Sequence, residues 1–83
     1  MNTQVKKLLR ELKAIQRHID KDHEMYGKLK TLIKLCDSHT ELDMPFYTAQ
    51  WDEIIRILHN WHSAAQYKGE SRECAMLENA IYA

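Results

Sequence analysis

Hydrophobic residues recur at intervals of three and four along residues 1–36 of the chain. With Val5 at position a of a heptad, the a and d positions are Val5, Leu8, Leu12, Ile15, Ile19, Asp22, Tyr26, Leu29, Ile33 and Cys36. All of these except Asp22 are apolar or amphipathic, which is typical of a packed helical seam. The pattern predicts one helix from about residue 3 to 36, about 50 Å long at 1.5 Å per residue. A break at Gly27, which weakens a helix by about 1 kcal/mol relative to alanine, is the alternative.

A second amphipathic pattern follows a connection, residues 37–47, in which Pro45 disfavours helical geometry at Met44. The next stripe predicts a helix over about 49–67, with Thr48 as its N-cap and Gly69 as its C-cap. The residues of this stripe are Trp51, Ile54, Ile55, Leu58, Trp61, His62 and Ala65. Ser71 can cap a short third helix with the stripe Cys74, Leu77 and Ile81. Alternatively, the third helix continues the second.

These elements predict an all-α fold within a single domain, residues 1–83. A long N-terminal helix packs against one or two shorter helices, as a helical hairpin or small bundle. Only two glycines and one proline are present, which favours a few helices over many short strands. The first helix is longer than the second can cover, and small chains often enlarge their core by self-association. We therefore expect a homodimer to complete the core.

Several classes of protein are excluded by composition. No apolar run approaches the roughly 18 residues that span a bilayer, and leucine and charge alternate too quickly at the N-terminus for a signal-peptide core. We expect a cytoplasmic location and no membrane partner. Cys36 and Cys74 are few and far apart, so they are expected to be thiols. Without a glycine-rich phosphate loop or a nucleophile motif, we expect no enzyme and no cofactor.

The segment RHIDKDHEMYG, residues 17–27, interrupts the seam with Asp22. One hypothesis is that Asp22 is buried and fixes the register of the helices, paired with His18 or with His62 of another helix. A second is that Asp22 faces water where the seam is uncovered. A third is a metal site, since the pairs His18–Asp22, Asp20–His23 and His59–His62 have helical chelate spacing. These pairs point in different directions, so no metal ligands are expected.

A net charge of zero conceals an asymmetry, because residues 1–36 carry a net charge of +5 and residues 37–83 carry −5. Most of the basic residues fall at the outward b, c and f positions of the first seam. They are Lys6, Lys7, Arg10, Lys13, Arg17, Lys21, Lys28 and Lys34. Cations near a helix N-terminus oppose the helix dipole, so binding of an anionic partner could favour this arrangement. A solvated face with no partner is the alternative interpretation.

Together these features predict a small non-enzymatic interaction protein, an adaptor or inhibitor, that binds another protein through the basic face. A nucleic-acid-binding regulator is the alternative, although the face carries no interleaved aromatic residues for stacking. A metal-binding bundle ranks third. The apolar residues of the connection either close the end of the bundle or form a second recognition patch. These residues are Leu42, Met44, Phe46 and Tyr47.

Overall fold

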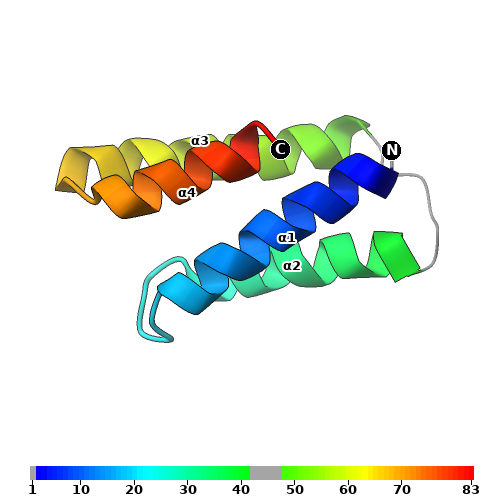
Figure 1. The fold of residues 1–83 in the computed structure, drawn as a ribbon, viewed down its shortest axis with the longest axis horizontal. Helices are drawn as coiled ribbons and strands as arrows, with labels where there is room; N and C mark the ends of the chain where they lie inside the picture. Colours follow the sequence, from blue (N-terminus) through cyan, green and yellow to red (C-terminus); the bar gives the residue numbers. More distant parts are fainter. Residues whose placement is uncertain (1, 42–47) are drawn as a thin grey trace.

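The computed structural model describes residues 2–41 and 48–83, and every regular element in these two ranges is a helix. The helices are α1 (Asn2–His18), α2 (Tyr26–Glu41), α3 (Thr48–Lys68) and α4 (Ser71–Ile81). Figure 1 shows two helical hairpins, α1–α2 and α3–α4, with α1 lying against both α2 and α4. The prediction of an all-α fold is confirmed. The predicted second patch, residues 42–47, lies outside the described residues.

The predicted single helix over residues 3–36 is wrong, because the chain turns back at residues 19–25. Asp20 and Asp22 are poor helix formers whose side chains compete for backbone N–H groups. In the turn, the His23 N–H donates to the Asp20 carbonyl at 3.0 Å, and the Tyr26 N–H donates to the His23 carbonyl at 3.0 Å. Gly27 does not cause the break, since it lies in the first turn of α2.

The heptad pattern survives the turn because both helices of the first hairpin face the same core. Its buried positions come from α1 and α2 alike: Val5, Leu8, Leu12, Ile15, Leu29, Ile33 and Cys36. A continuous apolar seam therefore arises from two antiparallel helices as readily as from one long helix. The seam of α1 is covered within the chain by α2 and α4. The homodimer is expected because the predicted first helix is too long for the second to cover. In this fold, other helices of the same chain cover the seam of α1.

The second hairpin follows the predicted stripe closely. Ile54, Leu58, Trp61 and Ala65 of α3 are buried, as are Leu77 and Ala80 of α4. Gly69 ends α3 with a φ of 77°. Its N–H donates to the Gln66 carbonyl at 3.2 Å, and the Glu70 N–H donates to the Ala65 carbonyl at 2.9 Å. These two bonds form a Schellman motif, so the predicted C-cap is confirmed.

The start of α4 differs from the prediction that Ser71 caps it. Ser71 is the first helical residue, while Glu70 occupies the N-cap position and makes no side-chain capping hydrogen bond. Glu73 instead supplies a negative charge to the first turn, where it interacts favourably with the positive end of the helix dipole. The alternative in which the third helix continues the second is wrong, because the chain reverses at Gly69 and Glu70.

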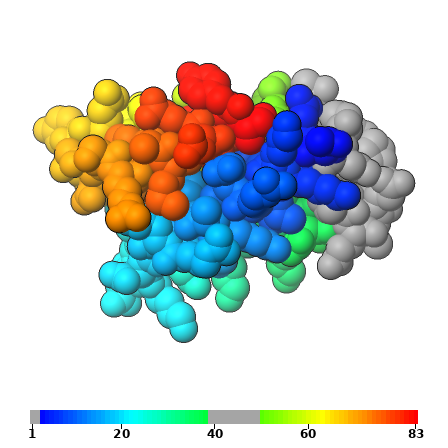
Figure 2. Space-filling view, viewed as in Figure 1, coloured from blue at the N-terminus to red at the C-terminus, as the bar shows by residue number. Residues whose placement is uncertain are grey.

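The molecule is elongated, with extents of 37 × 22 × 17 Å. Side chains of α1 and α4 form most of the face shown in Figure 2. Within residues 2–41 and 48–83, no helix is long and apolar enough to cross a membrane.

Candidate functional site

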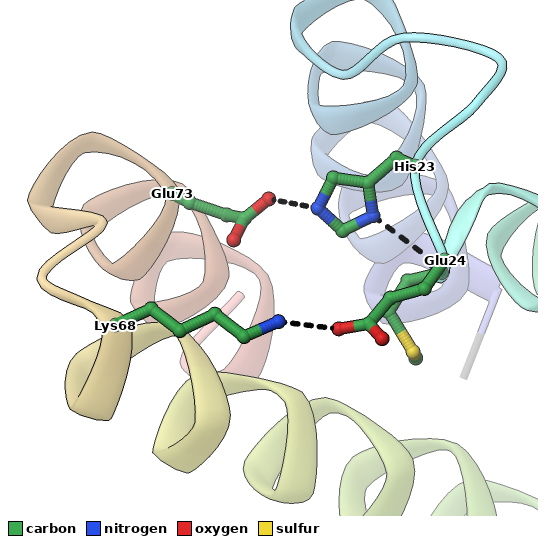
Figure 3. A network of polar contacts seen from close by, with 5 residues as sticks. His23, Glu24, Lys68 and Glu73 are labelled. Atoms are coloured by element: carbon green, nitrogen blue, oxygen red, sulfur yellow. Dashed lines mark hydrogen bonds and ion pairs between the residues drawn. The ribbon is translucent and has the colours of Figure 1, made fainter.

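Two pairs of polar side chains connect the turns of the two hairpins at one end of the molecule (Figures 1 and 3). Nε2 of His23, in the α1–α2 turn, lies 2.8 Å from Oε1 of Glu73 in α4. The next residue, Glu24, accepts a hydrogen bond from Nζ of Lys68 at 2.6 Å. Adjacent residues of one turn therefore hold both ends of the α3–α4 turn.

His23 is positioned by the start of α2. Its Nδ1 accepts the backbone N–H of Met25 at 3.0 Å, and the carbonyl of Met25 accepts the first helical bond, from Leu29. Because Nδ1 acts as an acceptor it carries no proton, so the imidazole is neutral and donates through Nε2. The contact between His23 and Glu73 is therefore a hydrogen bond from a neutral ring.

Glu73 is the one charged residue among the described side chains that is buried, with 7% of its surface exposed. A buried carboxylate is costly unless it is hydrogen-bonded and its charge is balanced. His23 supplies a donor without a positive charge. The ammonium of Lys68, whose pKa is raised first by Glu24 and more weakly by the charge of Glu73, is bound to Glu24.

The Glu24–Lys68 pair is electrostatically coupled but exposed. The hydrogen bond and charge of Lys68 lower the pKa of Glu24, and Glu24, followed more weakly by Glu73 and Glu70, raises the pKa of Lys68. Both side chains are more than half exposed, so the pair contributes little to stability.

A pocket of about 270 Å³ lies between the two pairs. We call it the turn pocket, and its lining residues are His23, Glu24, Trp61, Ala64, Ala65, Lys68, Glu70 and Glu73. The ring centroids of Trp61 and His23 lie 5.7 Å apart. Trp61 is 3% exposed, and its Nε1–H has no hydrogen-bond acceptor among the described residues. A buried indole N–H normally finds a partner, so Trp61, one of the lining residues, carries a buried donor that is unsatisfied among the described residues.

A second pocket, of about 340 Å³, brings His62, Cys74 and Glu78 together. The Cys74 Sγ donates to the backbone carbonyl of His62 at 3.8 Å, and His62 Nε2 lies 3.8 Å from Glu78 Oε2. Desolvation and the neighbouring glutamates raise the pKa of Cys74. A reactive cysteine needs a lowered pKa and a positive partner, so this arrangement does not suit nucleophilic catalysis.

The cations predicted to bind a partner are all exposed, but the structure divides them. Lys6, Arg10, Lys13 and Arg17 form one line along α1 at spacings of four, three and four residues, and we call this line the basic row. Lys7 flanks it on the same helix. Lys21 lies in the α1–α2 turn, and Lys28 and Lys34 lie on α2. Lys28 faces α3, since it lines a small pocket with Ile57 and Asn60.

The polar residues of the segment 17–27 behave differently from the prediction. Asp22 is exposed in the turn, so the hypothesis of a buried residue that fixes register is wrong and the water-facing one is confirmed. Within the described part of the chain, no three His, Cys, Asp or Glu side chains are grouped as a metal site. The pair His18–Asp22, whose spacing would suit chelation within one helix, is separated by the end of α1.

Sequence reasoning missed Glu73 and Lys68, and it considered His23 only as a possible chelating partner of Asp20. One signal was present for Glu73, because it lies one turn before Leu77 and so shares the buried stripe of α4. No local signal indicates that His23 reaches it, since that contact depends on how the two hairpins pack.

Comparison of the chain with protein-family models found no matching family, and comparison with curated proteins and with solved structures found no significant match.

Proposed function

We propose that this chain is a small non-enzymatic interaction protein, an adaptor or inhibitor, that binds an acidic surface of another protein through the basic row of α1. The observation that carries the proposal is the concentration of charge on one helix. The basic row lies within about 60° of the helix circumference, because residues advance by about 100° each. It extends for about 16 Å along the axis.

The basic row is little compensated by the other side chains that the structure describes. Among the described residues, its one ion pair joins Lys13 to Asp37 at 3.9 Å, and both side chains are nearly half exposed. Glu11 is the single acid within α1, and no acid lies in its first turn. Exposed charges of one sign steer an oppositely charged partner and raise the association rate.

A protein partner is favoured over a nucleic acid by the position of the exposed aromatic residues. Tyr67 and Tyr82 are 93% and 79% exposed, but they belong to the ends of the α3–α4 hairpin. Single-stranded nucleic acids are usually held by bases stacked on aromatic side chains beside a basic groove. The described part of α1 offers cations without such platforms.

The experiment is a pull-down from the native host with the double reversal Arg10→Glu and Arg17→Glu, performed with and without nuclease. The matched control reverses Arg56 and Arg72, which are exposed cations of α3 and α4. We expect the α1 reversal to lose a nuclease-resistant protein partner and the control to retain it. Equal capture by both variants at low salt would contradict the proposal. A partner lost on nuclease treatment, with a steep salt dependence, would establish the nucleic-acid alternative.

Self-association is a separate proposal. A homodimer would show twice the 9.9 kDa mass of the chain in light scattering, whereas a constant monomer mass up to high protein concentration would exclude it. Cytoplasmic location likewise stays a prediction.

A further inference from the structure

The imidazole of His23 uses its two nitrogens for two different contacts (Figure 3). Nε2 donates to Glu73 of α4 at 2.8 Å and so joins the two hairpins. Nδ1 accepts the backbone N–H of Met25 at 3.0 Å and so closes the turn before α2. The contact to Met25 requires a nitrogen without a proton, whereas the contact to Glu73 requires a nitrogen that carries one. Protonation of the ring therefore affects the two contacts in opposite directions.

The contact to Met25 is lost when the ring takes up a proton. An imidazolium carries an N–H at both nitrogens, so Nδ1 and the Met25 amide would direct two donors at each other across 3.0 Å. The side chain of His23 is 26% exposed, so water can accept both N–H groups once they separate. Two other bonds of this turn, from the His23 N–H to Asp20 and from the Tyr26 N–H to His23, join backbone groups and do not depend on the ring.

The contact to Glu73 becomes stronger with the same proton. Glu73 is 7% exposed, and a buried carboxylate without a positive partner is costly. A hydrogen bond between charged groups is roughly twice as strong as one between neutral groups. The imidazolium therefore compensates a buried charge that the neutral ring leaves uncompensated.

The charged groups that face His23 also favour the imidazolium. In the lining of the turn pocket they are Glu24 of the same turn, Lys68 at the end of α3, Glu70 between α3 and α4, and Glu73 of α4. Three carboxylates against one ammonium leave a net charge of −2 when the carboxylates are ionised. Within the described part of the chain, α1 adds no charged side chain to this lining.

We propose that His23 is a pH-sensitive switch between two arrangements of the α1–α2 turn. In the neutral form, the ring closes the turn through Met25. A proton taken up from water at Nδ1 breaks that hydrogen bond, frees the Met25 amide and converts the bond to Glu73 into an ion pair. Met25 also lines a small pocket with Lys28 and Ile57, so acid alters the surface between α2 and α3 while the hairpins stay joined. The switch involves neither the basic row nor its partner, so it extends beyond the proposed function.

The test follows the wild-type protein by NMR between about pH 5 and 8, the range in which histidine side chains usually change charge. Nitrogen-15 shifts of the His23 ring show which nitrogen carries a proton. The exchange rate of the Met25 amide with water, relative to an unstructured peptide at the same pH, measures its protection. As Nδ1 gains its proton, this protection should fall about three- to tenfold, the effect of losing one hydrogen bond. The Nε2–H should stay protected, because the bond to Glu73 persists.

Two variants of His23 separate its two contacts. His23→Asn places an amide oxygen near the position of Nδ1 but does not reach Glu73, so the Met25 amide should be equally protected throughout the pH range. His23→Gln can donate to Glu73 but has no acceptor at the Nδ1 position, so the Met25 amide should be unprotected throughout. His59→Asn changes an exposed histidine of α3, and this matched control should retain the wild-type pH dependence. Circular dichroism verifies that each variant folds, and the wild-type titration decides the question if one does not.

Four results would overturn the proposal. They are a His23 ring whose protons do not change across this range, a Met25 amide whose protection does not fall when the ring is protonated, the same fall in His23→Asn, and rapid exchange of the Nε2–H in the imidazolium form. None of these measurements involves Arg10 or Arg17, so the switch and the proposed function fail independently.

Discussion

His23 donates a hydrogen bond of 2.8 Å to the buried carboxylate of Glu73, and this bond joins the turn of one hairpin to the first turn of α4 in the other. The same imidazole accepts the Met25 N–H at the start of α2. A single side chain therefore contacts both the local reversal that divides the predicted long helix and the second hairpin.

Replacing His23 with alanine should lower the free energy of unfolding by about 1–3 kcal/mol. The change leaves Glu73 buried without its donor, and unsatisfied buried groups cost about this much. Urea denaturation followed by circular dichroism measures the effect. His59→Ala is the matched control, because His59 is exposed on α3, and it should change stability by less than about 0.5 kcal/mol. If both histidine variants were equally stable, the His23–Glu73 bond would make no contribution to the free energy of unfolding.

The pair Glu24–Lys68 predicts a pH dependence at each end of the scale. Lys68 lowers the pKa of Glu24, so the stabilisation from this group is present above the ordinary carboxyl pKa and is lost as pH falls through the lowered value. Glu24 raises the pKa of Lys68, so that contribution is present below the ordinary lysine pKa and is lost as pH rises through the raised value. In an NMR titration of the Glu24 side chain, Lys68→Met should move its pKa back upward. A midpoint that does not move would show that the two side chains do not pair in solution.

The two glycines should respond to alanine with opposite signs. Gly69 has a φ of 77° at the end of α3, a conformation that costs an L-residue about 1–2 kcal/mol, so Gly69→Ala should destabilise the protein by about that much. Gly27 is exposed in α2, and nothing lies within 4 Å of an added Cβ. Gly27→Ala should therefore stabilise by up to about 1 kcal/mol. Thermal melts of the two variants decide this, and a shift of the same sign in both would refute the assigned backbone conformations.

Asp22→Leu should leave stability within about 0.5 kcal/mol of the wild type, because Asp22 is exposed in the α1–α2 turn. A buried polar residue at a seam position would behave differently, since its replacement by leucine usually raises stability and can alter oligomeric state. Thermal melting and light scattering of this variant separate the two cases, and a large rise in melting temperature would contradict the exposed position.

The predicted second helix, about 49–67, agrees with α3 within a residue or two, and the short third helix agrees with α4. Both have a strong local signal in a 3–4 stripe, and α3 has a second signal in the glycine at its end. Residues 19–25 were misassigned because heptad spacing continues unchanged across them. A turn of seven residues keeps the phase of the pattern, and only the poor helix formers Asp20 and Asp22 indicated the reversal.

The helical class, the buried stripe of each helix and the exposure of the basic row followed from the order of the amino acids, because each depends on the spacing of residues along one element. Long-range packing was needed to establish that α1 and α2 fold back on each other, that the eight cations predicted to bind a partner divide between α1, a turn and α2, and that His23 meets Glu73. The turn pocket also depends on the tertiary structure. Its residues come from both hairpins, so it exists only when the hairpins pack together, and no periodicity within a single helix records that arrangement.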